Sequence, residues 1–144
     1  MLYLLDTNHC SYIMNGINKN PQYRKPHETK TLAKFHSVTS GILYICEVSI
    51  SEIIYGAETA PNVTSIYQRF NQLKTLLPCL TVTSDCWELH GKTKREMANS
   101  GKKMEDFDLM IACIAKKYGC IVVTNDGNFS NLPSGFVNVE NWAI

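Results

Sequence analysis

The sequence predicts an α/β fold with a central, mainly parallel sheet of four to five strands. Short apolar runs without polar alternation recur along the chain, which is typical of strands that are buried on both faces of a parallel sheet. Amphipathic or wholly apolar segments, long enough to cross over between such strands, separate these runs. With 144 residues, of which 44% are hydrophobic and 19% charged, the chain suits a single globular domain over residues 1–144.

Each expected element follows from a local pattern. The apolar run at 2–5 predicts the first strand, and the wholly apolar middle of 107–118 predicts a helix buried inside the domain and closed by Gly119. Ser49 and Glu52 form a capping-box pattern that places a helix start at Ser49. The other strands are expected at 42–46, 80–83, 120–124 and 136–139, the other helices at 7–14, 29–38, 66–77 and 85–99, and turns at Asn15-Gly16 and Ser40-Gly41.

Composition argues against several kinds of site. The six cysteines fall singly inside apolar segments, so we expect reduced, buried thiols and neither a zinc site nor a disulfide framework. The four histidines are scattered without metal-ligand spacing, and we assign none of them chemistry. No apolar run is long enough to span a bilayer, and the first one has no basic leader before it. We therefore expect no membrane association and a cytoplasmic location.

The net charge of +1 conceals two basic runs, 19–34 and 92–103, each of which contains a single acidic residue. A solvated helix face is the usual meaning of such a run. The alternative is a surface for a phosphate backbone. If these runs contact such a backbone, the candidate residues are Lys19, Arg24, Lys25, Lys92, Lys94 and Arg95.

Four acidic side chains stand at positions that a parallel α/β sheet would bring together. Asp6 and Asp126 follow the ends of expected strands, and Glu52 and Asp108 lie in the first turns of expected helices. Each also has an ordinary structural explanation, as a helix cap, a capping-box partner, a helix-start charge or an Asx-turn residue. With right-handed crossovers, however, all four positions gather at one edge of the sheet.

Four carboxylates that come close together repel one another, which raises their pKa values and weakens the fold unless a cation lies between them. Oxygen ligands without His or Cys select a hard ion, Mg²⁺ or Mn²⁺. Such an ion activates water and stabilises charge on a phosphoryl oxygen, so a phosphodiester is the expected substrate. If an ion neutralises four of the 13 acidic side chains, 14 basic ones face the remaining nine, and this excess would attract nucleic acid.

Five short segments occur in an order and spacing that are specific when taken together. They are Leu4-Leu-Asp6-Thr-Asn8, Ser49-x-x-Glu52-Ile-x-Tyr-Gly56, Asp108-Leu-x-Ile-Ala112, Val123-Thr124-Asn-Asp126-x-x-Phe129 and Val139-Glu-Asn-Trp142. At these segments, and over most of the chain, the sequence resembles PIN-domain ribonucleases, specifically the VapC-like toxins of bacterial type II toxin–antitoxin modules.

The resemblance implies a three-layer α/β/α, PIN-like fold and Mg²⁺- or Mn²⁺-dependent cleavage of RNA. It also implies a homodimer that is inhibited by a cognate antitoxin protein, which covers or invades the pocket. The catalytic and metal-binding residues would be Asp6, Glu52, Asp108 and Asp126, with Thr7, Asn8 and Thr124 in support.

Some features depart from the family's pattern. The 17–41 stretch looks longer than in compact members, and Phe107 precedes Asp108 where a small or polar residue is commoner. Glu105 and Asp106 add acidity nearby, and we expect them to be solvated charges at the helix start.

No His or Lys stands as an obvious general base, so we expect metal-activated water to attack in line and to leave a 5′-phosphate and a 3′-hydroxyl. Transfer, ribosomal and messenger RNA all fit as substrates. Two alternatives stay open. A non-catalytic module would bind RNA or protein with a vestigial pocket, although all four acids are intact. A Mg²⁺-dependent phosphatase of the haloacid-dehalogenase type would need an acid where Asn8 stands.

Overall fold

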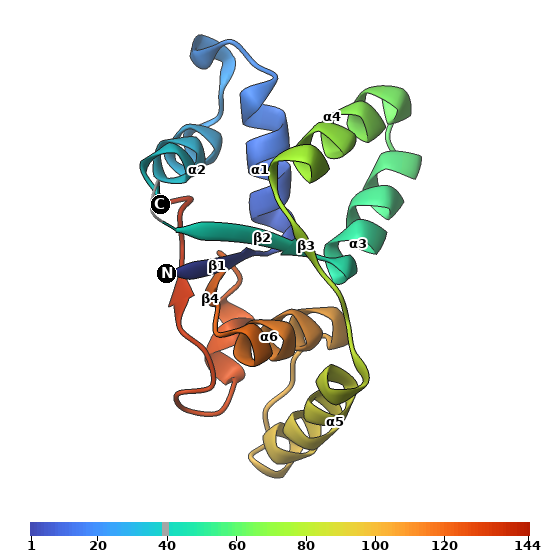
Figure 1. Ribbon diagram of the computed structural model, residues 1–144, viewed down its shortest axis with the longest axis vertical. Coiled ribbons are helices and arrows are strands. Elements are labelled where there is room, and N and C mark those ends of the chain that lie inside the picture. Colours follow the sequence, from blue (N-terminus) through green and yellow to red (C-terminus); the bar gives the residue numbers. More distant parts are fainter. Residues whose placement is uncertain (39–40) are drawn as a thin grey trace.

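The computed structural model describes residues 1–38 and 41–144 and places a sheet between two layers of helices (Figure 1). Its elements are β1 (Leu2–Leu5), α1 (Thr7–Ile17), the 3-10 turn η1 (Pro21–Tyr23), α2 (Pro26–Ser37), β2 (Ile42–Cys46), α3 (Glu47–Glu58), α4 (Val63–Leu76), β3 (Cys79–Leu80), α5 (Ser84–Asn99), α6 (Asp106–Tyr118), β4 (Ile121–Val123), the 3-10 turn η2 (Gly127–Asn131) and β5 (Val139–Glu140).

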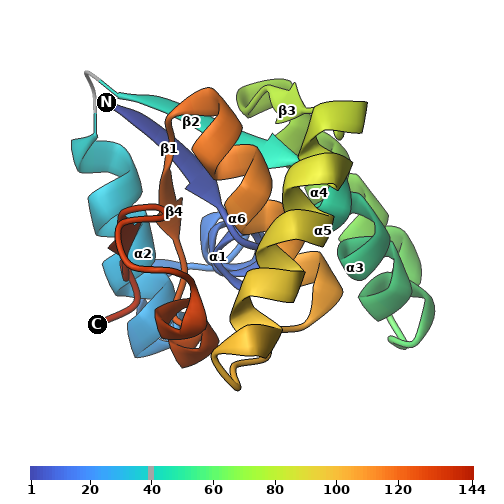
Figure 2. The same ribbon diagram turned by 90° about the horizontal axis from the view of Figure 1, so that it is seen from below.

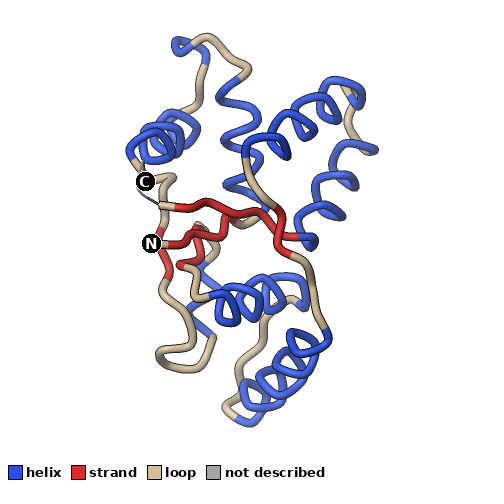
Figure 3. The backbone as a smooth tube through the Cα atoms, viewed as in Figure 1, coloured by secondary structure: helices blue, strands red, loops and turns tan. Residues whose placement is uncertain are grey.

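Among the described residues, the sheet has five strands in the order β3-β2-β1-β4-β5, and each neighbouring pair is parallel. The central strand is β1, in which Leu4 lies opposite Tyr44 of β2 on one side and Val122 of β4 on the other. The strands are drawn in red between the two blue helical layers in Figure 3. The parallel sheet and the three-layer arrangement confirm the expected fold class, and they place the carboxyl ends of all five strands along one edge.

Two hydrophobic cores fill the spaces on either side of the sheet. Leu4 belongs to the core that α5 and α6 cover, whereas Tyr3 and Leu5 belong to the core under α1, α2, α3 and α4. This split follows from the strand period, because successive side chains point to opposite faces. Figures 1 and 2 show the two groups of helices on opposite sides of the sheet.

Helix α6 is more deeply buried than α5, the other helix on its side of the sheet. Every residue from Leu109 to Ala115 is buried, as the wholly apolar segment predicts. Its end is also as expected, because Gly119 takes the left-handed conformation with φ 70° and its backbone N–H bonds back to the last turn. The tight packing of α6 fixes the position of its first turn, which carries Asp108.

The predicted start of α3 at Ser49 is wrong. The helix begins at Glu47 with Cys46 as its N-cap, so the capping box between Ser49 and Glu52 does not form. Ser49 is instead buried and contacts the hydroxyl of Thr7. Glu52 therefore lies in the second helical turn and is free of a capping role.

The expected stop at Asn15-Gly16 is also wrong, because α1 continues to Ile17. Gly16 serves a different purpose, since it allows α2 to approach closely. A Cβ atom at Gly16 would lie 2.7 Å from Cδ1 of the buried Leu32 in α2. The glycine is a packing residue inside the helix.

Other boundaries differ by a few residues. Helix α2 begins at Pro26, where proline suits the first helical position, and not at 29. Strands β3 and β5 are two residues long, and β5 lies later than the expected 136–139. The buried face of α5 consists of Cys86, His90, Thr93 and Met97, whereas Trp87 and Ala98 are exposed. The Ser40-Gly41 turn falls partly outside the described residues.

All six cysteines are free thiols; five of them are buried as expected, but Cys79 is exposed, against the prediction. Burial raises the pKa of the Cys46 thiol to about 11 and that of Cys113 to about 12, so both stay protonated at neutral pH. Within residues 1–38 and 41–144, no helix has the length and apolar character needed to cross a membrane.

Gly16→Ala should destabilise the protein. Overpacking against Leu32 typically costs about 1–3 kcal/mol, which exceeds the helix propensity of about 1 kcal/mol that alanine gains. Gly91→Ala in α5 is the matched control, because a Cβ atom there meets no described atom within 4 Å apart from its chain neighbours and its own helix backbone. Urea unfolding should show a lower free energy of unfolding for the first variant and a higher one for the second. Equal stabilisation of both would show that the α1–α2 contact tolerates the extra methyl group.

Candidate metal centre

The candidate site lies at the carboxyl edge of the sheet, where β1 and β4 end side by side. Asp6 follows β1 and caps α1, and its Oδ1 accepts a hydrogen bond of 2.8 Å from the backbone N–H of His9. The backbone N–H of Asp6 donates to the carbonyl of Val123, the last residue of β4. Three residues further along the chain, Asp126 caps η2 by accepting from the backbone N–H of Asn128 at 2.9 Å.

The half-buried Asp108, in the first turn of α6, is the electrostatic centre of the site. Its pKa is raised to about 6, first by burial and then by the negative charges of Asp126 and Glu52, a hydrogen bond with Asp126, and the charge of Asp6. The four acids that the sequence pattern singled out therefore lie close enough to affect one another. Their proximity produces the repulsion between carboxylates that is expected of a metal-free cation site.

Glu52 reaches the site from α3 and is held there by α1. Its Oε1 accepts a hydrogen bond of 2.5 Å from Oγ1 of Thr7, which also lies 3.0 Å from Oγ of Ser49. A hydroxyl group has a single hydrogen, so Thr7 donates to the carboxylate and Ser49 donates to Thr7. Thr7 thus orients a carboxylate, and the buried Ser49 supports it. Sequence analysis missed this role of Ser49 because it assigned the residue to a helix cap.

The other two expected supporting residues differ in exposure. Thr124 is buried, and its Oγ1 accepts from the backbone N–H of Asp126 at 3.0 Å, which shapes the turn that carries this acid. Asn8 is exposed in the first turn of α1. Its support of the site stays a prediction.

His9 is a further residue that sequence analysis missed. Its ring is fully buried, with Nδ1 2.9 Å from Oδ1 of Asp6 and Nε2 3.4 Å from the backbone nitrogen of Trp142. The available signal was its position three residues after Asp6, where the cap of α1 brings the two side chains together.

The first basic run is partly used for internal contacts. The ammonium group of Lys19 lies 2.9 Å and 3.0 Å from the two carboxylate oxygens of the buried Glu28. Arg24 donates from Nε to the carbonyl of Gly16, near the end of α1. These contacts tie α1 to α2, so Lys19 and Arg24 have structural roles that the RNA prediction did not foresee. Lys25 is exposed.

The second basic run is exposed along α5. Lys92, Lys94 and Arg95 all face solvent, and Lys94 pairs with Asp106 at 2.9 Å. Asp106 and Glu105 are exposed at the start of α6, as expected of solvated helix-start charges. The pairing with Lys94 lowers the pKa of Asp106, in the opposite direction to that of its neighbour Asp108.

The acids fit a hard divalent cation by donor type and by charge. Their ligand atoms are all carboxylate oxygens, which suit Mg²⁺ or Mn²⁺, and a cation would relieve the repulsion felt by Asp108. Among the described residues, no three His, Cys, Asp or Glu side chains are already arranged to hold one ion. Asp6 and Glu52 each direct one oxygen to a protein donor, so ligation would use their other oxygens after side-chain adjustment.

The raised pKa of Asp108 sets the sign of a pH effect on stability. A carboxyl group with a folded pKa of about 6, above its ordinary 3.8, stabilises the fold while it is protonated. This contribution is fully present below about pH 4 and is lost as the pH rises through 6. The metal-free protein should therefore lose stability across this window.

Asp108→Asn should stabilise the metal-free protein at pH 7, because the amide carries no charge to repel. A shift of two pKa units corresponds to about 3 kcal/mol, and screening of this half-exposed group reduces the expected gain to about 1 kcal/mol. Thermal unfolding in chelator should show a Tm rise of roughly 3 °C at pH 7 that shrinks towards pH 4. Asp106→Asn, which removes a paired surface charge, should give no gain. A lower Tm for the first variant would contradict the proposed charge conflict.

Comparison with known proteins gives a family match over most of the chain. A family model described as the PIN domain matches residues 3–134. Among characterised relatives, a protein of Rickettsia felis named "Ribonuclease VapC2" is 26% identical over 143 residues, which cover 99% of this chain and 98% of the relative. A protein of Shigella flexneri named "tRNA(fMet)-specific endonuclease VapC" is 26% identical over 141 residues, 98% of each chain.

Solved structures match over nearly the whole length as well. A chain in the structure of DNA-bound VapBC from Salmonella typhimurium superposes with a TM-score of 0.80 at 26% identity and covers 99% of both chains. A chain in the structure of VapBC2 from Rickettsia felis, bound to a promoter DNA fragment, superposes with a TM-score of 0.79 at 22% identity over 99% of both chains. The second match concerns the fold alone.

Proposed function

The chain belongs to the PIN domain family, and from this premise we propose that it is an Mg²⁺- or Mn²⁺-dependent ribonuclease, the toxin of a toxin–antitoxin pair. The observation that carries the proposal is the gathering of four carboxyl groups at the carboxyl edge of the parallel sheet, where Asp126, Glu52 and Asp6 raise the pKa of Asp108. The names of the relatives, a ribonuclease and a tRNA endonuclease, support RNA as the substrate class.

In the proposed mechanism the four acids bind the metal ion, and neighbouring side chains orient the acids. Asp6, Glu52 and Asp108 would bind the ion directly or through water, and Asp126 would assist them. When bound, such an ion acidifies a water molecule and neutralises charge on a phosphoryl oxygen. In-line attack by water on the phosphorus atom would break its bond to the 3′ oxygen and leave a 5′-phosphate and a 3′-hydroxyl.

The protein's own contribution is orientation. Thr7 and Ser49 fix the carboxylate of Glu52, and Thr124 shapes the turn that carries Asp126. His9 is fully buried with both ring nitrogens engaged, so its imidazole does not serve as a base for the substrate. These contacts support a site that is oriented before the substrate arrives.

RNA would bind mainly along α5. Its exposed Lys92, Lys94 and Arg95 offer cations for phosphates without reading bases. Lys94 and Lys103 also line a cavity of about 320 Å³ together with Asn128, two residues from Asp126. This cavity would connect the basic surface with the acidic edge, whereas Lys19 and Arg24 have structural partners.

The proposed partners are a cognate antitoxin and a second copy of the chain. The two matched solved structures are those of VapBC and VapBC2 bound to DNA, which supports a cognate antitoxin as the partner, and we expect it to cover the acidic site. A cytoplasmic location, with access to RNA, is part of the same proposal.

Substitution of the central acids should abolish cleavage. Asp6→Asn and Asp108→Asn remove charge from the ion site, and each should slow Mn²⁺-dependent cleavage of end-labelled RNA about 100-fold or more. Asp106→Asn is the matched control, since it lies in the same helical turn as Asp108 but points to solvent and Lys94. It should retain activity.

Two outcomes would count against this assignment. If Asp108→Asn cleaves RNA at the unchanged rate, Asp108 is not part of the site. If Asp106→Asn loses as much cleavage activity as Asp108→Asn, the exposed acids Glu105 and Asp106 are favoured as ligands. A wild-type protein that neither cleaves RNA nor binds Mn²⁺ in calorimetry would instead be the non-catalytic module.

A further inference from the structure

A hydrogen-bonded chain links the C-terminal segment to the first acid of the site through His9. The backbone N–H of Trp142 points to Nε2 of His9 at 3.4 Å, and Nδ1 of the same ring lies 2.9 Å from Oδ1 of Asp6. The ring is completely buried. The two contacts therefore lie outside the reach of bulk water.

Which atoms donate in these two hydrogen bonds follows from the chemistry of the two partners of the His9 ring. A backbone N–H can only donate, so Nε2 of His9 must accept and carries no hydrogen. The single hydrogen of the neutral imidazole then resides on Nδ1, from which it is donated to the carboxylate of Asp6. Trp142 thus selects the tautomer that Asp6 requires.

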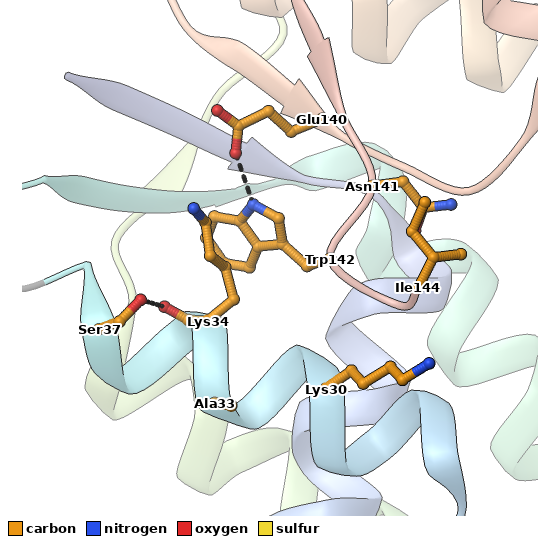
Figure 4. A pocket seen from close by; sticks show the side chains of 8 residues that line it. All are labelled: Lys30, Ala33, Lys34, Ser37, Glu140, Asn141, Trp142 and Ile144. Atoms are coloured by element: carbon orange, nitrogen blue, oxygen red, sulfur yellow. Dashed lines mark hydrogen bonds between the residues drawn. The ribbon is translucent and has the colours of Figure 1, made fainter.

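Trp142 is itself fixed in place. Its indole N–H donates to Oε2 of Glu140 at 2.7 Å, as Figure 4 shows, and its ring packs edge-on against Tyr3 of β1 at 5.3 Å between centroids. Glu140 lies in β5 opposite Val123 of β4. The backbone N–H that orients His9 is therefore anchored to the sheet that carries the site.

The second donor on Asp6 exceeds what a helix cap needs. The backbone N–H of His9 already completes the cap by donating to Oδ1 of Asp6 at 2.8 Å. The imidazole adds a donor to the same oxygen, which pins the carboxylate plane and leaves Oδ2 for another partner. Burial alone requires partners for both ring nitrogens, and the partner of Nδ1 is the first acid of the site.

We propose that His9 is a positioning residue that holds Asp6 through the Nδ1–H tautomer set by Trp142, which would leave Oδ2 of Asp6 available to a metal ion. The proposal rests on the proposed function for its effect on RNA cleavage. Groups that orient metal ligands in this way typically contribute 10- to 100-fold to metal affinity or activity.

Two substitutions that differ only in the location of a donor test the proposal. In His9→Asn the amide nitrogen takes the place of Nδ1, and in His9→Gln it takes the place of Nε2. His9→Asn should keep Mn²⁺ affinity and kcat within about threefold of the unchanged protein. His9→Gln should lose 10- to 100-fold in both, with an unchanged KM for RNA because the basic surface on α5 is untouched.

Nuclear magnetic resonance of the unsubstituted protein gives a readout that needs no activity and no variant. The ¹⁵N shifts of His9 should show a protonated Nδ1 and a bare Nε2. Addition of Mg²⁺ should move the Nδ1 signal of His9 and leave that of the exposed His36 unchanged. If both variants fail to fold, this measurement alone decides the proposal.

The possible failures are distinguishable. RNA cleavage by the unchanged protein together with equal losses in His9→Asn and His9→Gln, or with an Nε2–H tautomer, would overturn the role of His9 and leave the ribonuclease proposal intact. Absence of RNA cleavage, with a Mg²⁺-dependent shift at His9, would overturn the ribonuclease proposal and retain the positioning of Asp6 for an ion.

Discussion

The parallel pairing of β1 with β4 is the constraint on which the candidate site depends. Leu5 stands opposite Val123 in this pairing, and the backbone N–H of Asp6 extends it by one hydrogen bond beyond the end of β1. Both strands therefore leave the sheet at the same edge. This arrangement brings Asp6 and Asp126 together from opposite ends of the sequence, and the crossover helices α3 and α6 add an acid each.

Packing provides the stability that allows the site to hold a charge conflict. Ionisation of Asp108 is unfavourable beside its neighbours, as its raised pKa indicates. The next seven residues of α6, Leu109 to Ala115, are all buried between the sheet and α5. To move the backbone of Asp108 away from the other acids, the helix would have to expose this apolar surface, which costs about 25 cal/mol per Å². The acid therefore remains where repulsion disfavours it, which is common at functional sites.

The sequence was sufficient for the parallel sheet, the buried helix and the gathering of the four acids, because each element has a local signature and the parallel topology then brings the acids together. It was insufficient where a partner distant in sequence decides a residue's role. Gly16 resembled a helix stop until Leu32 was seen against it, and Ser49 resembled a cap although it supports Thr7. His9 showed no metal-ligand spacing, because its role is to contact a carboxylate and a C-terminal backbone group.

Three of the four acids accept hydrogen bonds from protein donors that orient them, and Asp108 is the exception. Asp6, Glu52 and Asp126 each accept a hydrogen bond from a donor on their own or a neighbouring helix or turn, so their conformational entropy is already reduced in the folded protein. Asp108 has its hydrogen bond with Asp126, another acid. The donors on Asp6 and Glu52 each occupy one oxygen of the carboxylate. An incoming cation would therefore still require adjustment of these side chains, but they have less conformational freedom to lose than solvated ones, and the cation would remove the repulsion around Asp108.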